Sequence, residues 1–135
     1  MRYIMNTKVF YELWQMECCG KPFKPGDNIE WYVTTTDRLA TALDIDGVEY
    51  IYDAHFDEWD GILTLKGVVK DISVYYEKYE LVPATGHNML KPVPGISEKI
   101  AIASSEDVEK YRGEFQASGF IVGLDEITVC PTKQE

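Results

Sequence analysis

The long run from Ile62 to Tyr79 constrains the fold of this chain most strongly. It is rich in β-branched and aromatic residues throughout, and it is too long for one ordinary strand of about 3 to 10 residues. Gly67 divides the run. Because a glycine inside a strand pattern suits a bulge or a sharp bend, we expect the chain to turn a corner here between the two halves of a small barrel.

Alternation of apolar and polar residues predicts a strand on each side of a turn near the N-terminus. Residues 29–33 alternate in this way, and Pro22–Asp27 supplies two prolines and a Gly-Asp pair for the turn. The strand before the turn should cover Lys8–Met16. Trp14 and Trp31 then lie on the two flanking strands, and we expect both side chains to be largely buried.

Two further strand regions and one irregular region follow. Residues 48–56 alternate after the turn pair Asp46 and Gly47, and the polar face of this predicted strand is acidic. Residues 120–129 are apolar enough for a buried last strand or strand pair. The segment Leu81–Ile96 contains three prolines and two glycines, which predicts an irregular connection.

One helix is predicted with a clear start. Ser104 is a suitable N-cap with acidic residues in the first turn, Tyr111 and Phe115 fall on one helical face, and Gly119 is a suitable stop. A second, shorter helix is expected over Asp37–Leu43, which is only about two turns long.

These elements predict one mainly β domain that spans residues 1–135. A length of 135 residues fits a single compact domain. The expected architecture is a small, strongly bent sheet or partly open barrel of about five to seven strands, with one or two short helices. OB-like and SH3-like arrangements both fit this pattern.

The charge balance narrows the classes of partner. Thirteen basic and twenty-three acidic residues give a net charge of −10, which opposes binding to nucleic acid or to an anionic membrane surface. No apolar run is long enough for a membrane span or a leader segment, so we expect a cytoplasmic protein. Three cysteines are an odd number, and we expect free thiols.

A short motif near the N-terminus gives the only specific resemblance. The residues Trp-Gln-Met-Glu-Cys-Cys-Gly at 14–20 resemble the signature of a family of small uncharacterised bacterial proteins that is described as a domain of unknown function. Weaker landmarks of that family are similar to the segments 67–72, 92–95 and 119–122 of this chain. The resemblance implies no catalytic residue, cofactor or substrate.

The cysteines and histidines provide the candidate metal or thiol chemistry. Cys18 and Cys19 are adjacent, and Cys130 and His87 lie elsewhere in the chain. Structural zinc sites draw ligand pairs from a short knuckle, whereas adjacent residues on a strand point to opposite faces. We therefore predict no metal and no cofactor, with one cysteine of the pair buried and the other at the turn. Cys18, Cys19 and His87 are the weak metal candidates, and a Cys18–His87 catalytic dyad has no supporting local signature.

The acidic stretch at residues 37–60 provides the candidate binding site. It holds one basic and eight acidic residues, which would attract a basic protein partner and would otherwise serve as a solvated face. The residues that we predict to form this surface are Asp53, Asp57, Glu58, Trp59 and Asp60.

Three functions remain open at this point. The leading interpretation is a non-enzymatic binding or accessory module that uses an acidic, aromatic-bearing surface. A protein that neutralises a basic toxin or enzyme, as immunity or inhibitor proteins do, is an alternative in the same class. A metal- or thiol-dependent protein centred on Cys18 and Cys19 is the alternative in another class. The sequence leaves the oligomeric state open.

Overall fold

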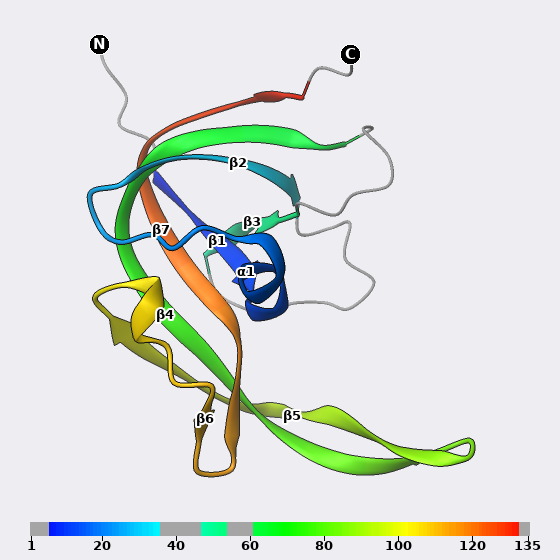
Figure 1. The fold of residues 1–135 in the computed structure, drawn as a ribbon. Helices are drawn as coiled ribbons and strands as arrows, with labels where there is room; N and C mark the ends of the chain where they lie inside the picture. The colour runs from blue at the N-terminus through cyan, green and yellow to red at the C-terminus, as the bar shows by residue number, and fades with distance from the viewer. Residues whose placement is uncertain (1–5, 36–46, 54–60, 133–135) are drawn as a thin grey trace.

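The computed structural model describes residues 6–35, 47–53 and 61–132, without the side chains of Cys19 and Pro94 (Figure 1). These residues are mainly β, with very little helix. The elements in chain order are β1 (Asn6–Glu12), α1 (Leu13–Cys19), β2 (Asn28–Thr35), β3 (Val48–Tyr52), β4 (Leu63–Ala84), β5 (His87–Ile102), the 3-10 helix η2 (Ser105–Asp107), β6 (Tyr111–Arg112) and β7 (Phe115–Pro131).

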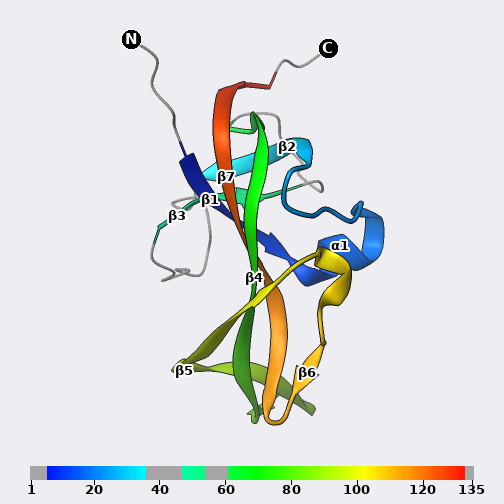
Figure 2. The same cartoon turned by 90° about the vertical axis from the view of Figure 1, so that its left-hand side faces the viewer.

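The predicted small, mainly β barrel is confirmed, and five of its strands close completely where the sequence predicted a bent sheet or a partly open barrel. The circuit runs β4, β2, β3, β1 and β7, and β7 pairs again with β4. Four of these pairings are antiparallel, and the pairing of β1 with β3 is parallel. β5 and β6 extend the sheet outside the barrel. Figure 2 shows β4 and β7 running side by side over most of the height of the molecule.

The pairing pattern distinguishes the two architectures that the sequence left open. An SH3-like barrel is an antiparallel meander, whereas an OB-fold is a Greek-key barrel in which the third and fifth strands pair in parallel and a helix follows the third. If β4 is counted as the first strand, β7 is the second, and β1, β2 and β3 are the third, fourth and fifth. In this order the third and fifth strands, β1 and β3, pair in parallel, and α1 follows the third, as in an OB-fold. The fold is therefore an OB-type barrel with permuted strand order.

The predicted bend at Gly67 is confirmed. The register of β4 against β7 shifts between Lys66 and Val68, and Gly67 is buried at this point. A Cβ atom on Gly67 would lie 3.0 Å from Ile127 Cγ2 and 3.1 Å from the Asp125 carbonyl oxygen. Only glycine lets the two backbones approach this closely while β4 turns the corner.

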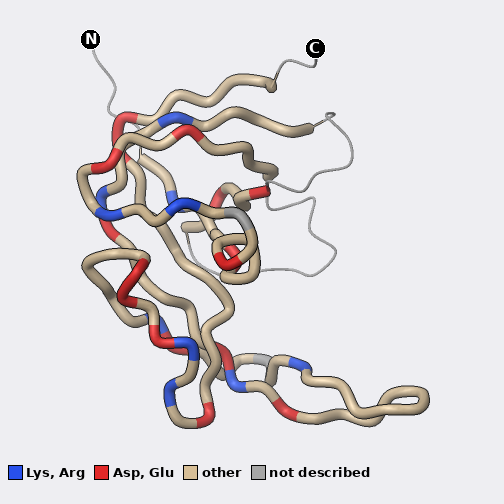
Figure 3. Tube along the Cα trace, in the orientation of Figure 1, with Lys and Arg blue, Asp and Glu red and all other residues tan. Residues whose placement is uncertain are grey.

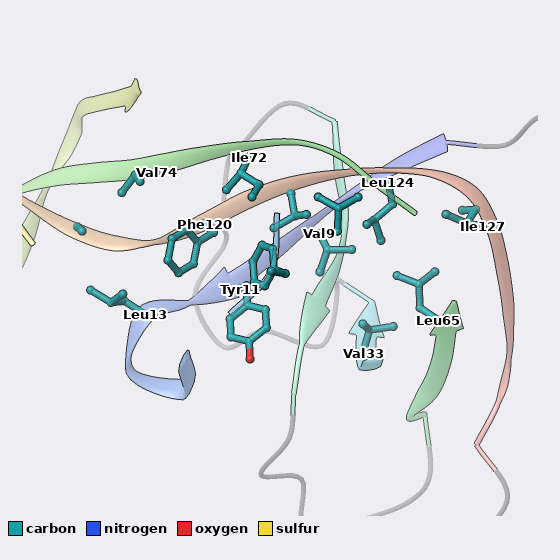
Figure 4. Packing of buried hydrophobic residues seen from close by; sticks show 14 of the residues in the cluster. Val9, Tyr11, Leu13, Val33, Leu65, Ile72, Val74, Phe120, Leu124 and Ile127 are labelled. Atoms are coloured by element: carbon teal, nitrogen blue, oxygen red, sulfur yellow. The ribbon is translucent and has the colours of Figure 1, made fainter. Parts of the chain in front are cut away.

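The core fills the barrel from strands that are distant in the sequence. Val9, Leu65, Phe120 and Leu124 have no exposed surface, and they lie on β1, β4 and β7. Figure 4 shows their side chains converging inside the barrel. The packing joins both ends of the chain to its middle.

A second, smaller apolar cluster lies on the other face of β1. Phe10, Ile51 and Ile121 are each at most 5% exposed, and Phe10 meets the Tyr75 ring edge-on at 6.1 Å between centroids. Because successive strand residues point to opposite faces, these side chains lie outside the barrel interior. The outer face of β1, β3 and β7 is therefore apolar here.

The strand predicted over Lys8–Met16 is wrong in its second half. β1 ends at Glu12, and Leu13–Cys19 forms α1. Leu13 is buried and Met16 packs against the core. Residues three apart share one face of a helix, whereas a strand would place them on opposite faces. Trp14 falls on the solvent side of α1 and is 51% exposed, so the expectation that it is largely buried is also wrong.

The irregular connection predicted over Leu81–Ile96 is wrong as well. Residues 81–84 extend β4, residues 87–96 belong to β5, and a turn at Thr85 and Gly86 joins the two strands. Prolines break a central strand because they lack an N–H donor, but a two-stranded ribbon has free edges that tolerate them. The apparent loop is therefore a hairpin.

The predicted helix from Ser104 is reduced to one 3-10 turn. Ser104 does act as its cap, because its Oγ accepts a hydrogen bond from the Glu106 N–H at 3.2 Å. Gly113 adopts φ +59 between β6 and β7, which a continuing helix does not allow. Tyr111 and Phe115 lie on these two strands.

Two parts of the sequence prediction fall outside the described residues. They are the short helix over Asp37–Leu43 and the part of the 48–56 strand beyond residue 53. β3 does begin directly after Gly47, as expected, and the last strand is confirmed as the longer β7.

The close packing of the barrel predicts that a larger residue in place of Gly119 lowers the stability of the fold. A Cβ atom there would lie 2.5 Å from the Tyr11 carbonyl oxygen and 2.9 Å from Phe10 Cζ. We expect Gly119→Ala to lower the free energy of unfolding by about 1–3 kcal/mol more than the control, measured by urea denaturation. The control is Gly86→Ala, where nothing lies within 4 Å and the substitution strains only a φ of +77. Equal losses in the two variants would contradict this packing.

Candidate functional site

A groove of about 590 Å³ opens at one end of the barrel. This volume lies in the range of small-molecule and peptide-anchor sites. The groove lies between the ends of β1 and β3, the first half of β2 and the segment that links α1 to β2. Its lining residues are Tyr11, Lys21, Pro22, Phe23, Asp27, Asn28, Ile29, Glu30, Trp31 and Tyr52.

Four aromatic rings form the wall of the groove. Tyr11 and Tyr52 stack with their centroids 3.8 Å apart and their planes 13° apart. Trp31 stands edge-on to Tyr11 at 5.3 Å and to Tyr52 at 5.7 Å, and it also meets Phe23 at 5.1 Å. Tyr11 and Phe23 are buried, whereas Trp31 and Tyr52 are half-buried and face the opening.

Hydrogen bonds hold Phe23 in place. Its N–H donates to Ser105 Oγ at 2.8 Å, and the Ser105 N–H donates to the Phe23 carbonyl at 2.9 Å. The linking segment is fastened a second time to β4, because the Gly26 N–H donates to the Val69 carbonyl and the Val69 N–H donates to the Asp27 carbonyl. The groove is therefore formed before any ligand binds.

The helix α1 supports the wall from its other side. Gln15 is buried, and its Nε2 donates to the Tyr52 carbonyl at 3.1 Å. Gly20 ends α1 in contact with Tyr11, so closely that a Cβ atom would overlap the tyrosine hydroxyl and lie 2.8 Å from Met16 Cα. The glycine of the N-terminal motif thus lets the chain pass beside the Tyr11 ring.

Charged residues at the groove are mixed, with an acidic excess. Asp27 is half-buried, and its Oδ2 accepts a hydrogen bond from the Lys24 N–H at 3.0 Å, so its carboxylate caps the turn. Glu30 and Lys21 are exposed at the rim. Figure 3 shows acidic and basic positions interspersed along the described chain rather than gathered in a basic stripe.

The predicted acidic binding surface is only partly described. Asp53 directly follows Tyr52, is half-buried, and donates its N–H to the Tyr32 carbonyl at 2.9 Å. The other four residues, Asp57, Glu58, Trp59 and Asp60, lie outside the described residues. The structure therefore locates one member of the set, next to the aromatic wall.

The candidate metal and thiol residues are not brought together. Cys18 is exposed on α1, and His87 is exposed at the tip of the β4–β5 hairpin, on the far side of the molecule (Figure 1). Cys130 is exposed near the end of β7. Within residues 6–35, 47–53 and 61–132, no three ligating side chains form a group that could hold a metal ion. The expected buried cysteine of the pair is not Cys18, and the Cys19 side chain is not described.

Sequence reasoning missed the groove. Trp31 and Tyr52 lie in phase with core residues on β2 and β3, so their pattern indicates burial and not a binding wall. Phe23 follows Pro22 in a segment that reads only as a turn. The signal that could have identified the site is the position of Tyr52 at the end of β3.

Two tyrosines of β4, outside the groove lining, have altered acidity. Burial raises the pKa of Tyr76, whose hydroxyl donates to the Glu109 carbonyl at 2.7 Å. Burial also raises the pKa of Tyr79, whose hydroxyl lies 2.8 Å from Ser118 Oγ. Both phenols are therefore protonated wherever the protein is folded near neutral pH.

These raised pKa values predict a loss of stability in base. The unfolded chain releases the two protons near pH 10, before the folded chain does, so the free energy of unfolding should fall as the pH rises above about 10. Urea denaturation between pH 9 and 11 should show a shallower fall for Tyr76→Phe than for the parent. If the free energy of unfolding falls equally steeply with pH in the variant and the parent, Tyr76 has the same pKa in the folded and unfolded chains.

The aromatic wall predicts different roles for two tryptophans. Trp31→Ala removes a ring that contacts three others, and we expect it to lower the free energy of unfolding by about 2–4 kcal/mol. Trp14→Ala removes an exposed side chain and should cost less than about 1 kcal/mol. Urea denaturation followed by far-UV circular dichroism measures both. Similar losses would contradict the described positions of the rings.

Comparison with known proteins gives a family but no function. No helix among the described residues is long and apolar enough to cross a membrane. No curated protein and no solved structure matches the chain. The model of the family of unknown function DUF6578 matches residues 5–126, which include α1, the groove and six of the seven strands in full. The chain belongs to this family of unknown function.

Proposed function

We propose that this protein is a non-enzymatic binding module of the cytoplasm whose groove receives a basic segment of a partner protein. The observation that supports the proposal is the preformed groove itself, with the half-buried rings of Trp31 and Tyr52 at its opening and acidic residues at its rim. Aromatic faces attract lysine and arginine side chains through cation–π interactions. Carboxylates beside those faces add direct charge complementarity.

The charge of the whole chain supports the same class of partner. A net charge of −10 raises the local concentration of cationic partners and speeds their association. The groove adds the anchoring that a diffuse charge lacks, because aromatic side chains in partly desolvated pockets carry most of the energy at protein interfaces. Charge would then determine the rate of encounter, and the rings would determine where the partner docks.

The predicted acidic surface continues from the groove along the chain. Tyr52 belongs to the wall and Asp53 follows it directly, with Asp57, Glu58, Trp59 and Asp60 only a few residues further on. We include these five residues in the proposed docking surface. An immunity or inhibitor protein that neutralises a basic toxin or enzyme would be one physiological form of this function.

The OB-type barrel suggests nucleic acid as the competing ligand, since such barrels bind oligonucleotides on the face of their second and third strands. The strands in those positions here are β7 and β1. Their outer face carries the apolar residues Phe10 and Ile121, each buried, in place of a basic groove. Fold alone does not determine function, and these side chains favour a protein ligand.

A labelled arginine peptide provides the test. We expect a fluorescein-labelled peptide of alternating arginine and alanine to bind the parent protein, and a peptide with glutamine in place of arginine not to bind. Glu30→Gln combined with Asp53→Asn should weaken binding about tenfold in fluorescence polarisation, because one carboxylate at the rim and one that directly follows Tyr52 lose their charge without losing volume. Affinity should also fall as salt is added, because the charges are screened.

The matched control removes the same number of negative charges from residues that do not line the groove. Glu98→Gln combined with Glu114→Gln removes two exposed carboxylates around β5 and β6. This variant should bind the peptide within about twofold of the parent. Equal weakening in the two double variants would show that only net charge matters, and that the groove is not the site.

A further inference from the structure

The β4–β5 hairpin extends beyond the barrel as a two-stranded arm. Pairing of β4 with β7 stops at Lys78, whereas pairing with β5 continues to Ala84. Residues 79–92, which we call the arm, therefore pair only with each other. Figure 1 shows the arm pointing away from the barrel. A lone two-stranded ribbon is only marginally stable in water, so a partner surface would stabilise it.

The arm exposes apolar side chains on both faces. Leu81 and Leu90 are cross-strand partners, so their side chains share one face, and they are 66% and 56% exposed. Met89 is 42% exposed on the other face, opposite Val82. Contiguous exposed apolar surface of this kind indicates an interaction site.

The arm is electrically neutral in a strongly acidic chain. Its formal charges are Glu80 and Lys91, which are cross-strand partners of opposite sign, while the whole chain carries −10. A basic partner gains nothing from charge here. Two copies of this chain repel one another elsewhere, and the neutral arm is where they can approach at least electrostatic cost.

The proline pattern determines how two arms can meet. Pro83 and Pro92 lie in the two strands and lack the N–H donors that an added strand would need. This disfavours edge-to-edge pairing. Two arms can still pack through the face that carries Leu81 and Leu90. A contact in which both copies use the same face is the geometry of a two-fold symmetric dimer.

We propose that the Leu81–Leu90 face of the arm is a dimer contact between two copies of this chain. The contact is small, so the dimer is weak and dependent on concentration. It is separate from the groove, because none of the residues that line the groove belongs to the arm. Added salt strengthens the dimer because it screens repulsion between two acidic chains, the opposite of its effect on binding of a basic peptide.

Sedimentation velocity on the full chain tests the proposal. The parent should form dimers as its concentration rises from micromolar to about 1 mM, and more strongly at higher salt. Leu81→Thr combined with Leu90→Thr keeps strand propensity and charge, and it should raise the dimer Kd at least about tenfold. The control Tyr111→Thr removes a side chain that is 64% exposed on β6, outside the arm, and should change the Kd less than about twofold.

Any of three results would overturn the proposal. The first is a parent protein that stays monomeric throughout this range. The second is a dimer that the two leucine substitutions leave unchanged in a variant with the parent's circular dichroism spectrum. The third is flotation of a monomeric parent with phosphatidylcholine vesicles that the leucine substitutions abolish, because the arm would then be a lipid contact.

Discussion

The pairing of β4 with a strand on each of its sides holds this structure together. Its first part pairs with β2 and also with β7, and this double pairing closes the barrel. The chain can do so because it bends at Gly67, where a side chain would collide with β7. The same strand continues beyond Lys78 and becomes half of the arm. Barrel closure and arm position are therefore consequences of one long, bent strand.

Closure also creates the groove. Tyr11, Trp31 and Tyr52 come from three different strands, and they meet because the parallel β1–β3 pairing brings the end of β3 beside β1. The segment that carries Phe23 is fastened to η2 and to β4 by backbone hydrogen bonds. A ligand would find these rings already ordered, which lowers the entropy that binding must overcome. Rigid aromatic anchors at a barrel opening are suited to recognition.

The sequence predicted correctly those features that depend only on residues close together in the chain. The bend at Gly67, the start of β3 and the Ser104 cap are each determined by short-range chemistry, and each is confirmed. The sequence did not predict the β4–β5 hairpin, because its prolines indicate a loop unless the free edges of the ribbon are known. It did not predict the groove either, because whether Trp31 faces a core or an opening depends on where the barrel ends, and non-local pairing decides that position.

The proposed function requires the rings of the groove to bind a basic segment. Intermolecular nuclear Overhauser effects between the parent protein and the arginine peptide test it most directly, because they locate the peptide on the surface atom by atom. We expect contacts from the arginine methylene protons to the Trp31 and Tyr52 rings at the groove. Contacts confined to the outer face of β1 and β7, around Phe10 and Ile121, would contradict it.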